Sequence, residues 1–218
     1  MRIQGRIRAI RQAATTEGYL AVTAITLRGS LDMRFYEQTN ATAAVLMVGD
    51  ASGNFDSPAS NLYPRLAAEL RSRGVASLHV NFRNPASFHD SVYDVLTGID
   101  FLAARCCSHI GLLGHAFGGA VAISAGALST EVVTVVALAP QSYGTNAVTE
   151  LTPRSLLLLH GVEDETFPAA GSKEIFQRAR EPKSLHFVNS GHRFKEAADE
   201  VYAKVSHWLV DELRAKAA

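Results

Sequence analysis

The feature that most constrains this chain is a glycine-rich turn between an expected strand and an expected helix. Residues 114–119 read Gly-His-Ala-Phe-Gly-Gly, after a strand pattern at 109–113 and before an apolar helix pattern at 117–128. A Gly-x-Ser-x-Gly sequence on such a turn is the pattern of a nucleophile elbow. Here Ala116 takes the position of the serine, and an alanine methyl group cannot attack a carbonyl carbon.

The two outer glycines have a steric role in an elbow. The turn is strained and its neighbouring backbone segments pass close together, so a side chain at Gly114 or Gly118 would collide with them. Taken alone, however, a glycine-rich turn of this kind is equally typical of a phosphate cradle or of close packing. The rest of the chain has to decide between these interpretations.

The composition predicts one globular α/β domain over residues 1–218. The chain has 218 residues, of which 47% are hydrophobic and 19% charged, which is enough for a full core. Its 21 basic and 21 acidic residues cancel, so no basic field is available for nucleic acid or an anionic membrane. No apolar run approaches the roughly 20 residues that span a bilayer, and the N-terminus lacks the apolar stretch of a secretion signal. We therefore expect a cytoplasmic protein with no nucleic-acid and no membrane partner.

The two cysteines and the scattered histidines predict no metal site and no cofactor. Cys106 and Cys107 are adjacent, and adjacent cysteines rarely bridge without strain, so we expect reduced thiols. No second pair of metal-ligating residues accompanies them. His115, beside Ala116, is interpreted mainly as a packing residue. The remaining histidines outside the motifs described below are interpreted as structural: His79, His89, His109, His160, His186 and His207.

The hydrophobic pattern predicts a β-rich entry followed by alternating strands and helices. Residues 1–40 contain strand patterns at 3–10, 19–27 and 31–38, and the break at 28–30 predicts a hairpin. The core is expected over residues 43–213, with strands at 43–48, 75–80, 110–113, 132–139, 155–159 and 184–188, and helices at 57–73, 88–104, 117–128, 173–180 and 196–216. This order predicts a mostly parallel, doubly wound sheet that an antiparallel hairpin enters. Ligands of such sheets bind at the carboxyl ends of the strands.

Three segments follow expected strands in the order nucleophile, acid, histidine. The elbow comes first, the strand at 155–159 then continues into HGVEDETFP at 160–168, and the strand at 184–188 continues into NSGHRF at 189–194. In this order and spacing, the chain from about residue 43 to 213 resembles the α/β-hydrolase superfamily. Within it the chain is most similar to the compact dienelactone-hydrolase-like or small esterase branch, with alanine in place of the nucleophilic serine.

The resemblance implies a catalytic triad with Ala116 at the nucleophile position, Asp164 as the acid and His192 as the base. The spacing His-Gly-x-x-Asp-x-x-hydrophobic-Pro selects Asp164 over its neighbours Glu163 and Glu165. The alternatives are that Asp164 is a loop carboxylate capping the next helix and that His192 is a solvated loop histidine.

The resemblance also implies an oxyanion hole. One donor would be the backbone N–H of Phe117, and the other would come from the loop after the strand at 43–48. That loop carries Asp50 and Ala51, where similar small esterases usually have glycines or a His-Gly pair. A carboxylate about 5 Å from a developing oxyanion would cost roughly 3 kcal/mol at an effective dielectric near 20, comparable to the loss of one donor. Alternatively, Asp50 points away and caps the turn.

The expected site is shallow, because the segment at 141–152 is too short for the lid that many relatives insert. We therefore expect no cap domain and a small acyl or carbonyl compound as partner rather than a large lipid. The residues expected to line the pocket are Phe55, Gln141, Ser142, Tyr143 and Phe194.

The sequence thus predicts a serine-hydrolase scaffold whose parent activity is ester or acyl hydrolysis and which Ala116 leaves inactive or strongly impaired. Two alternatives are a pseudoenzyme that binds a small molecule without turnover and a His192–Asp164 dyad that performs acid–base chemistry without an acyl-enzyme. Ala116 is either a laboratory substitution that traps substrate, as the intact dyad suggests, or a natural loss, as the acidic Asp50 suggests. We favour the natural loss. The sequence indicates neither the substrate nor the oligomeric state.

Overall fold

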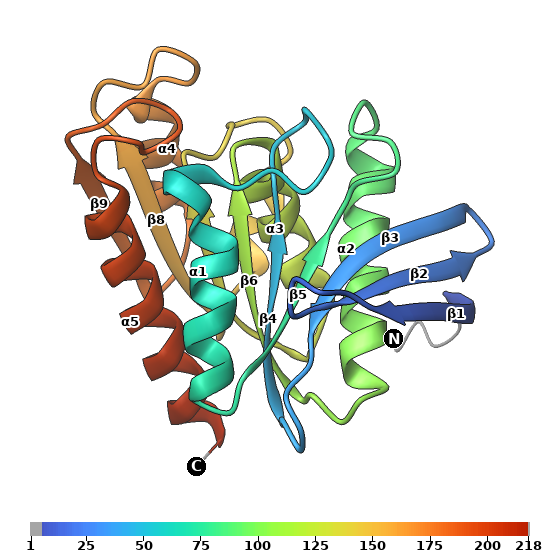
Figure 1. Cartoon of the computed structure of the whole chain (residues 1–218). Coiled ribbons are helices and arrows are strands. Elements are labelled where there is room, and N and C mark those ends of the chain that lie inside the picture. Colours follow the sequence, from blue (N-terminus) through green and yellow to red (C-terminus); the bar gives the residue numbers. More distant parts are fainter. Residues whose placement is uncertain (1–5, 218) are drawn as a thin grey trace.

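The chain folds as one mixed sheet between two layers of helices (Figure 1). The computed structural model describes residues 6–217, and within them the nine-stranded sheet has the order β1-β2-β3-β5-β4-β6-β7-β8-β9. Strands β1, β2 and β3 are antiparallel to their neighbours, and all pairs from β5 to β9 are parallel. Helices α1 and α5 cover one face, and α2, α3 and α4 cover the other. The mostly parallel, doubly wound sheet with an antiparallel N-terminal hairpin is thereby confirmed.

The elements lie close to the ranges that the sequence predicts. The strands are β1 (Ile7–Ala14), β2 (Leu20–Thr26), β3 (Gly29–Tyr36), β4 (Ala43–Val48), β5 (Ala76–Val80), β6 (His109–His115), β7 (Val132–Leu138), β8 (Ser155–Gly161) and β9 (Lys183–Val188). The helices are α1 (Pro58–Ser72), α2 (Phe88–Ala103), α3 (Phe117–Leu128), the 3-10 helix η1 (Asn146–Glu150), α4 (Ala169–Arg178) and α5 (Ala198–Ala217). The first strand, expected at 3–10, begins at Ile7, and residues 3–5 lie outside the described part of the chain.

Strand β4 shows why the parallel part of the sheet needs continuous apolar runs. All six of its residues are buried, because helices cover both faces. Ala44, Leu46 and Val48 point into the core formed with α2 and α3. The alternate residues point into the core formed with α1 and α5. This period of two divides the interior into two cores on either side of the sheet.

The start of α1 differs from the expected capped helix. Ala59, Ser60 and Asn61 have φ values of 47°, 51° and 64°, which form a left-handed turn that costs non-glycine residues backbone energy. Two contacts compensate for it. The N–H of Ala59 donates to the Arg193 carbonyl at 2.8 Å, and the hydroxyl of Ser57 accepts from the Tyr63 N–H at 2.9 Å. Ser57 therefore caps the right-handed part of the helix one turn later than predicted.

The connection between β7 and β8 carries only η1, so among the described residues no cap domain covers the carboxyl ends of the strands. The sequence did not predict η1. It predicted a helix from residue 173, whereas α4 begins four residues earlier, at Ala169, directly after Pro168. No helix within residues 6–217 combines the length and the apolar character needed to cross a membrane.

A buried ion pair attaches the loop after β5 to helix α2 and to the N-terminal hairpin. Asp94 has no exposed surface, and its carboxylate accepts from the Arg83 side-chain Nε at 2.7 Å and from the Arg83 backbone N–H at 2.9 Å. The same guanidinium donates to the Thr26 hydroxyl of β2 at 3.1 Å. The pair thus holds the loop against the helix that follows it, and through Thr26 it ties both to the distant strand β2.

Removing the Asp94 carboxylate should destabilise the whole fold. We expect Asp94→Ala to lower the free energy of unfolding by about 3–5 kcal/mol, because a buried guanidinium is left without its counter-charge. Urea denaturation followed by circular dichroism measures the change. Asp199→Ala, which removes the exposed partner of Arg65, is the control and should leave stability nearly unchanged. Equal effects of the two substitutions would contradict this account.

Candidate active site

Ala116 joins β6 to α3 in the strained conformation of an elbow. Its φ of 55° and ψ of −116° lie in a region that side-chain-bearing residues rarely adopt. A Cβ atom added at Gly114 would lie 2.1 Å from the Gly118 carbonyl oxygen, and one added at Gly118 would lie 2.1 Å from the Gly49 carbonyl oxygen. Both glycines are therefore required by backbone-to-backbone contact, which is the steric reason that the sequence suggested.

Asp164 and His192 form a hydrogen bond across the ends of β8 and β9. The Asp164 carboxylate lies 2.7 Å from Nδ1 of His192. Its other oxygen accepts from the backbone N–H groups of Thr166 at 2.8 Å and Phe167 at 2.9 Å. Burial alone would raise the pKa of Asp164, but these hydrogen bonds outweigh it and hold the pKa below its ordinary value. The carboxylate is thus charged and orients the imidazole through Nδ1.

His160 is a second histidine that contacts the Asp164 carboxylate. The sequence analysis predicted only a structural role for it. Its Nε2 donates to the Phe167 carbonyl at 3.0 Å and lies 3.2 Å from the Asp164 carboxylate. Its Nδ1 lies 2.7 Å from the Ser172 hydroxyl. Burial lowers the pKa of His160, so the ring is neutral and Nδ1 accepts from Ser172. The sequence signal for this contact was its position directly before the acidic turn.

His115 attaches the end of β6 to the loop that carries His192. The fully buried ring donates from Nε2 to the His192 backbone carbonyl at 3.0 Å. The two imidazole rings lie 4.8 Å apart. Burial lowers the pKa of His115 to about 4, so the ring is neutral at pH 7. This residue therefore positions the His192 backbone in addition to packing.

Asp50 caps its own turn and faces a cation. Its carboxylate accepts from the Ser52 N–H at 2.8 Å and lies 3.4 Å from Arg193. The Arg193 guanidinium also forms a two-point pair with Asp56, at 2.7 and 3.1 Å. Burial acts to raise the pKa of Asp50, but the hydrogen bonds from Ser52 and the charge of Arg193 lower it overall. Sequence reasoning missed Arg193, whose only signal was its place directly after His192.

The residues expected to form the oxyanion hole lie at the start of α3 and in the loop that packs against it. Phe117 is the first residue of α3. The Gly49 carbonyl packs against Gly118 of the same helix turn, and Asp50 and Ala51 follow Gly49 directly. The loop after β4 thus reaches the N-terminus of α3, where backbone N–H groups are unpaired within the helix.

Comparisons with known proteins identify the architecture. No protein-family model and no curated protein sequence matches the chain. A dienelactone hydrolase from Anabaena variabilis superposes with a TM-score of 0.75 at 18% identity, covering 93% of this chain and 98% of that one. An esterase from Pyrococcus furiosus gives 0.73 at 18%, covering 89% and 91%. Est1E from Butyrivibrio proteoclasticus gives 0.72 at 14%, covering 85% and 95%.

The chain has the α/β-hydrolase fold. At identities this low the likeness concerns the fold alone. Est1E has also been solved with ferulic acid bound, in a structure with a TM-score of 0.70 at 13% identity, covering 85% of this chain and 96% of that one.

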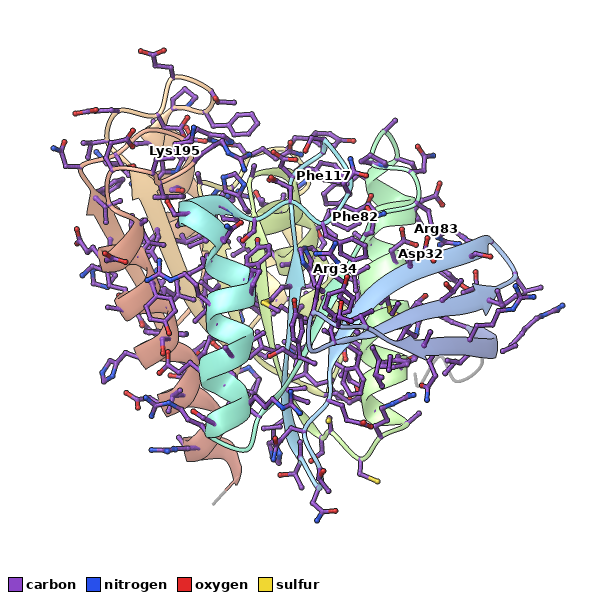
Figure 2. All side chains as sticks on the ribbon, viewed as in Figure 1. Asp32, Arg34, Phe82, Arg83, Phe117 and Lys195 are labelled. Carbon is purple, nitrogen blue, oxygen red and sulfur yellow. The ribbon has the colours of Figure 1, made fainter. Side chains whose placement is uncertain are left out.

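On this α/β-hydrolase fold, aromatic side chains lie beside the elbow. Phe117 packs edge-to-face on Phe82 at 5.6 Å (Figure 2). It also packs on Phe88 at 5.9 Å, and Tyr143 continues the row at 5.8 Å from Phe88. Tyr143 is 75% exposed. The row therefore runs from exposed Tyr143, through half-buried Phe88, to Phe117 and Phe82 in the core next to Ala116.

The other residues expected to line the pocket divide into two groups. Gln141 donates to the Tyr143 carbonyl at 3.2 Å, and exposed Ser142 lies in the same segment. Phe55 lies on the β3 side of the loop after β4, where its ring contacts His79. Phe194 differs from the expectation. It has no exposed surface, and its ring centre lies 6.2 Å from that of His115, so it belongs to the core and lines no open pocket.

One group of residues has the composition of a metal site. Asp50, Asp56 and His115 each offer a ligand atom, and these atoms lie within 4.8 Å of one another. Arg193 already bonds both carboxylates. Because this guanidinium supplies the positive charge, a divalent ion would have to displace it.

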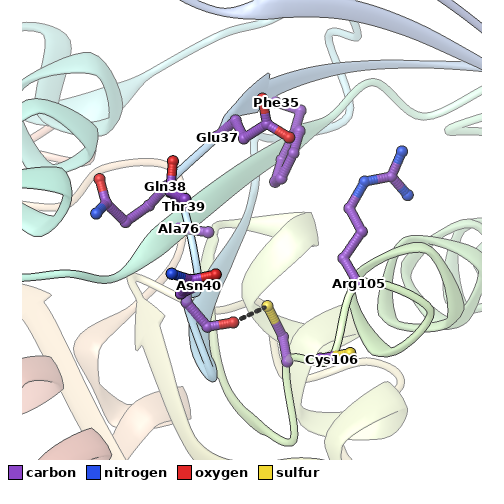
Figure 3. Close-up of a pocket in the computed structure, with 10 residues that line it drawn as sticks. Phe35, Glu37, Gln38, Thr39, Asn40, Ala76, Arg105 and Cys106 are labelled. Atoms are coloured by element: carbon purple, nitrogen blue, oxygen red, sulfur yellow. Dashed lines mark hydrogen bonds between the residues drawn. The ribbon is translucent and has the colours of Figure 1, made fainter.

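Two hollows lie at the opposite, amino ends of the parallel strands. One of about 380 Å³ contains Arg105 and the adjacent cysteines (Figure 3). The other, of about 1020 Å³, lies between β1, α2 and residues 128–131. The Cys107 thiol donates to the Ala41 carbonyl at 3.5 Å, and burial, followed by the charge of Cys106, raises its pKa. Cys107 is therefore a protonated structural thiol rather than a nucleophile.

The neutral His115 should make the fold acid-sensitive. Its pKa is 6.5 when unfolded and about 4 when folded, so in that window only the unfolded state binds the proton. Through His115, each pH unit lost there should remove about 1.4 kcal/mol from the free energy of unfolding, and buried His79, whose pKa is lowered to about 3, should add a similar loss. Urea denaturation between pH 7 and pH 4 measures the total slope, and His115→Gln should reduce it by about 1.4 kcal/mol per pH unit. The exposed His207→Gln is the control, and an unchanged slope in His115→Gln would contradict the assignment.

Proposed function

We propose that this protein carries an esterase-type site that binds small acyl or carbonyl compounds but cannot form an acyl-enzyme. The observation that carries the proposal is the His192–Asp164 hydrogen bond beside a strained elbow whose central residue is Ala116. With serine at position 116, His192 would accept its proton and Asp164 would orient the imidazole. The Phe117 N–H and the turn of Asp50 and Ala51 would stabilise the oxyanion.

The ligand class follows from the shape and lining of the site. No cap domain covers the strand ends among the described residues, and Tyr143 and half-buried Phe88 form an exposed aromatic surface that packs on Phe117, the neighbour of Ala116. Such a surface suits a small ligand with a flat apolar part. The ferulic acid bound by Est1E is a compound of this kind.

A second candidate function keeps acid–base chemistry. The charged Asp164 and its bond to Nδ1 of His192 are intact, and a neutral imidazole so oriented can accept a proton from water. In this case His192, rather than a serine, would carry out the slow hydrolysis of a bound ester. The variants below separate the two functions.

The chain as given should be inert to serine-directed reagents. Without a hydroxyl at position 116, a fluorophosphonate probe has no activated oxygen to phosphonylate. Intact mass spectrometry after incubation should show the unmodified mass, while Ala116→Ser should gain one adduct. Stoichiometric labelling of the chain as given would place the nucleophile elsewhere and overturn the assignment of position 116.

Restoring the hydroxyl should restore hydrolysis. We expect Ala116→Ser to cleave p-nitrophenyl acetate, and we expect a further Asp164→Asn substitution to lower kcat by about 10⁴-fold, because the imidazole would lose its orientation. Release of p-nitrophenol measures both rates. His207→Gln in the same background is the control and should leave the rate unchanged.

The same background tests the charge of Asp50. Arg193 and Ser52 hold this carboxylate, so we expect Asp50→Asn to change the rate by less than about tenfold. A gain of about 100-fold would show that the carboxylate opposes the oxyanion. Ala116→Ser activity that persists after Asp164→Asn would exclude a triad mechanism. Hydrolysis by the chain as given that His192→Gln abolishes would favour the dyad alone.

A further inference from the structure

Arg34 on β3 is a half-buried cation that forms no ion pair with an acidic side chain of the described residues. Its guanidinium carbon lies 4.2 Å from the ring centre of Phe55 and 5.0 Å from that of Tyr19, and within residues 6–217 it forms neither an ion pair nor a side-chain hydrogen bond. Asp32, on the same strand, accepts from the Thr23 hydroxyl at 2.7 Å. Asp56 pairs with Arg193. The positive charge of Arg34 is therefore balanced by none of these groups.

The stacking leaves the donors of Arg34 free. A guanidinium over an aromatic ring uses its flat face, whereas its N–H groups lie in its own plane. Phe55 and Tyr19 therefore hold the side chain in place without consuming its hydrogen bonds. An acceptor that approaches in the plane of the guanidinium can still bond two N–H groups at once.

His79 adds a second unsatisfied group next to Arg34. The two residues are partners in the β3–β5 register, so their side chains lie on the same face of the sheet. The His79 ring packs edge-to-face against Phe55 at 5.2 Å and Tyr63 at 4.9 Å, and only 2% of the residue is exposed. Burial, followed by the charge of Arg34, lowers its pKa to about 3, so the ring is neutral.

The polar atoms along this face of β5 lack partners in the described chain. Nε2 of His79, the hydroxyl of Ser77 and the side-chain oxygen of Asn81 are all buried without a hydrogen bond. These three residues alternate along the strand and so share one face. Buried polar groups in folded proteins are nearly always bonded. Of the three, His79 is the one paired with Arg34 in the strand register, so its free Nε2 is the group that a ligand of Arg34 would meet.

We propose that Arg34, His79 and the ring of Phe55 form a binding site for a small carboxylate. A carboxylate matches the two-point geometry of the guanidinium, and the Nε2–H form of neutral His79 supplies a further donor. A single cation balances one negative charge, which favours a carboxylate over a phosphate dianion. The rings of Phe55 and Tyr19 flank the site and favour a ligand with a flat apolar body.

Tyr19, Arg34 and Phe55 are each partly exposed, so a ligand can reach the guanidinium from solvent, while the His79 ring lies buried beneath Phe55. Helix α1 lies over β4 and leaves the hairpin of β2 and β3 without a helix on this face (Figure 1). Figure 2 shows Arg34 on β3 of that hairpin, where the strand runs beside β5. Phe55 belongs to the loop that also carries Asp50, so the bound carboxylate would lie beside the loop that reaches the elbow.

Titration with sodium benzoate at constant ionic strength tests the site. Two-dimensional NMR should show a saturable shift of the Arg34 side-chain Nε–H signal and of the His79 ring signals. We expect Arg34→Gln to weaken binding by at least about tenfold, since the charge and the two-point contact are lost. Arg34→Lys keeps the charge but loses the planar fork, and it should bind benzoate more weakly than the original chain.

Two controls make the result decisive. Benzamide has the same ring without the charge and should bind at least about tenfold more weakly than benzoate. Arg11→Gln removes an exposed arginine of the neighbouring strand β1 and should leave the affinity unchanged. Equal binding of benzamide, equal affinity in Arg34→Gln, or shifts confined to His192 would overturn the proposal.

The readout is independent of hydrolysis and remains informative if a variant does not fold. The site-resolved shifts of the original chain decide whether benzoate contacts Arg34. Failure of the Ala116→Ser protein to hydrolyse esters would leave this result unaffected.

Discussion

Backbone meets backbone where the central strands end, and the contact leaves no room for a side chain. Gly114 at the end of β6 touches Gly118 in α3, and Gly118 touches Gly49 after β4, each at a spacing that a Cβ atom would violate. This contact holds Ala116 in its strained conformation and brings the turn of Asp50 to the start of α3. Both sides of the candidate site are therefore positioned by backbone packing rather than by side-chain interactions, in accordance with the rigidity of close-packed interiors.

Around that contact, the charged groups are balanced locally. Asp164 is held by His192 and two backbone N–H groups. Asp50 and Asp56 share Arg193, so the acidic turn next to the elbow carries less uncompensated charge than its sequence suggests. The buried His115 is neutral, which avoids the cost of an unpaired interior cation. The charge balance of the site thus depends on two neighbours of the motif residues: His115, which precedes Ala116, and Arg193, which follows His192.

The sequence predicted the strand ends well because they are encoded locally. Glycines, strand-length apolar runs and the spacing of Asp164 and His192 were sufficient to predict the sheet and the meeting of these two side chains. Contacts between distant elements were not predictable in this way. The direction of Phe194 into the core and the pairing of Arg193 with Asp56 depend on side-chain orientation after folding. The left-handed turn at Ala59 is stabilised by a carbonyl far away in the chain, for which no local signal exists.

In the elbow, the glycines serve the packing of the backbone and residue 116 serves the chemistry, and this difference has an evolutionary consequence. The glycines are constrained by the fold itself, whereas residue 116 differs from a nucleophile by a single oxygen atom that contributes nothing to the interlocking of the backbone. Selection for stability therefore preserves the glycines but does not distinguish serine from alanine at position 116. A lineage could lose the hydroxyl by one mutation and retain the whole scaffold, with its strained turn and oriented imidazole, for as long as the protein has to fold.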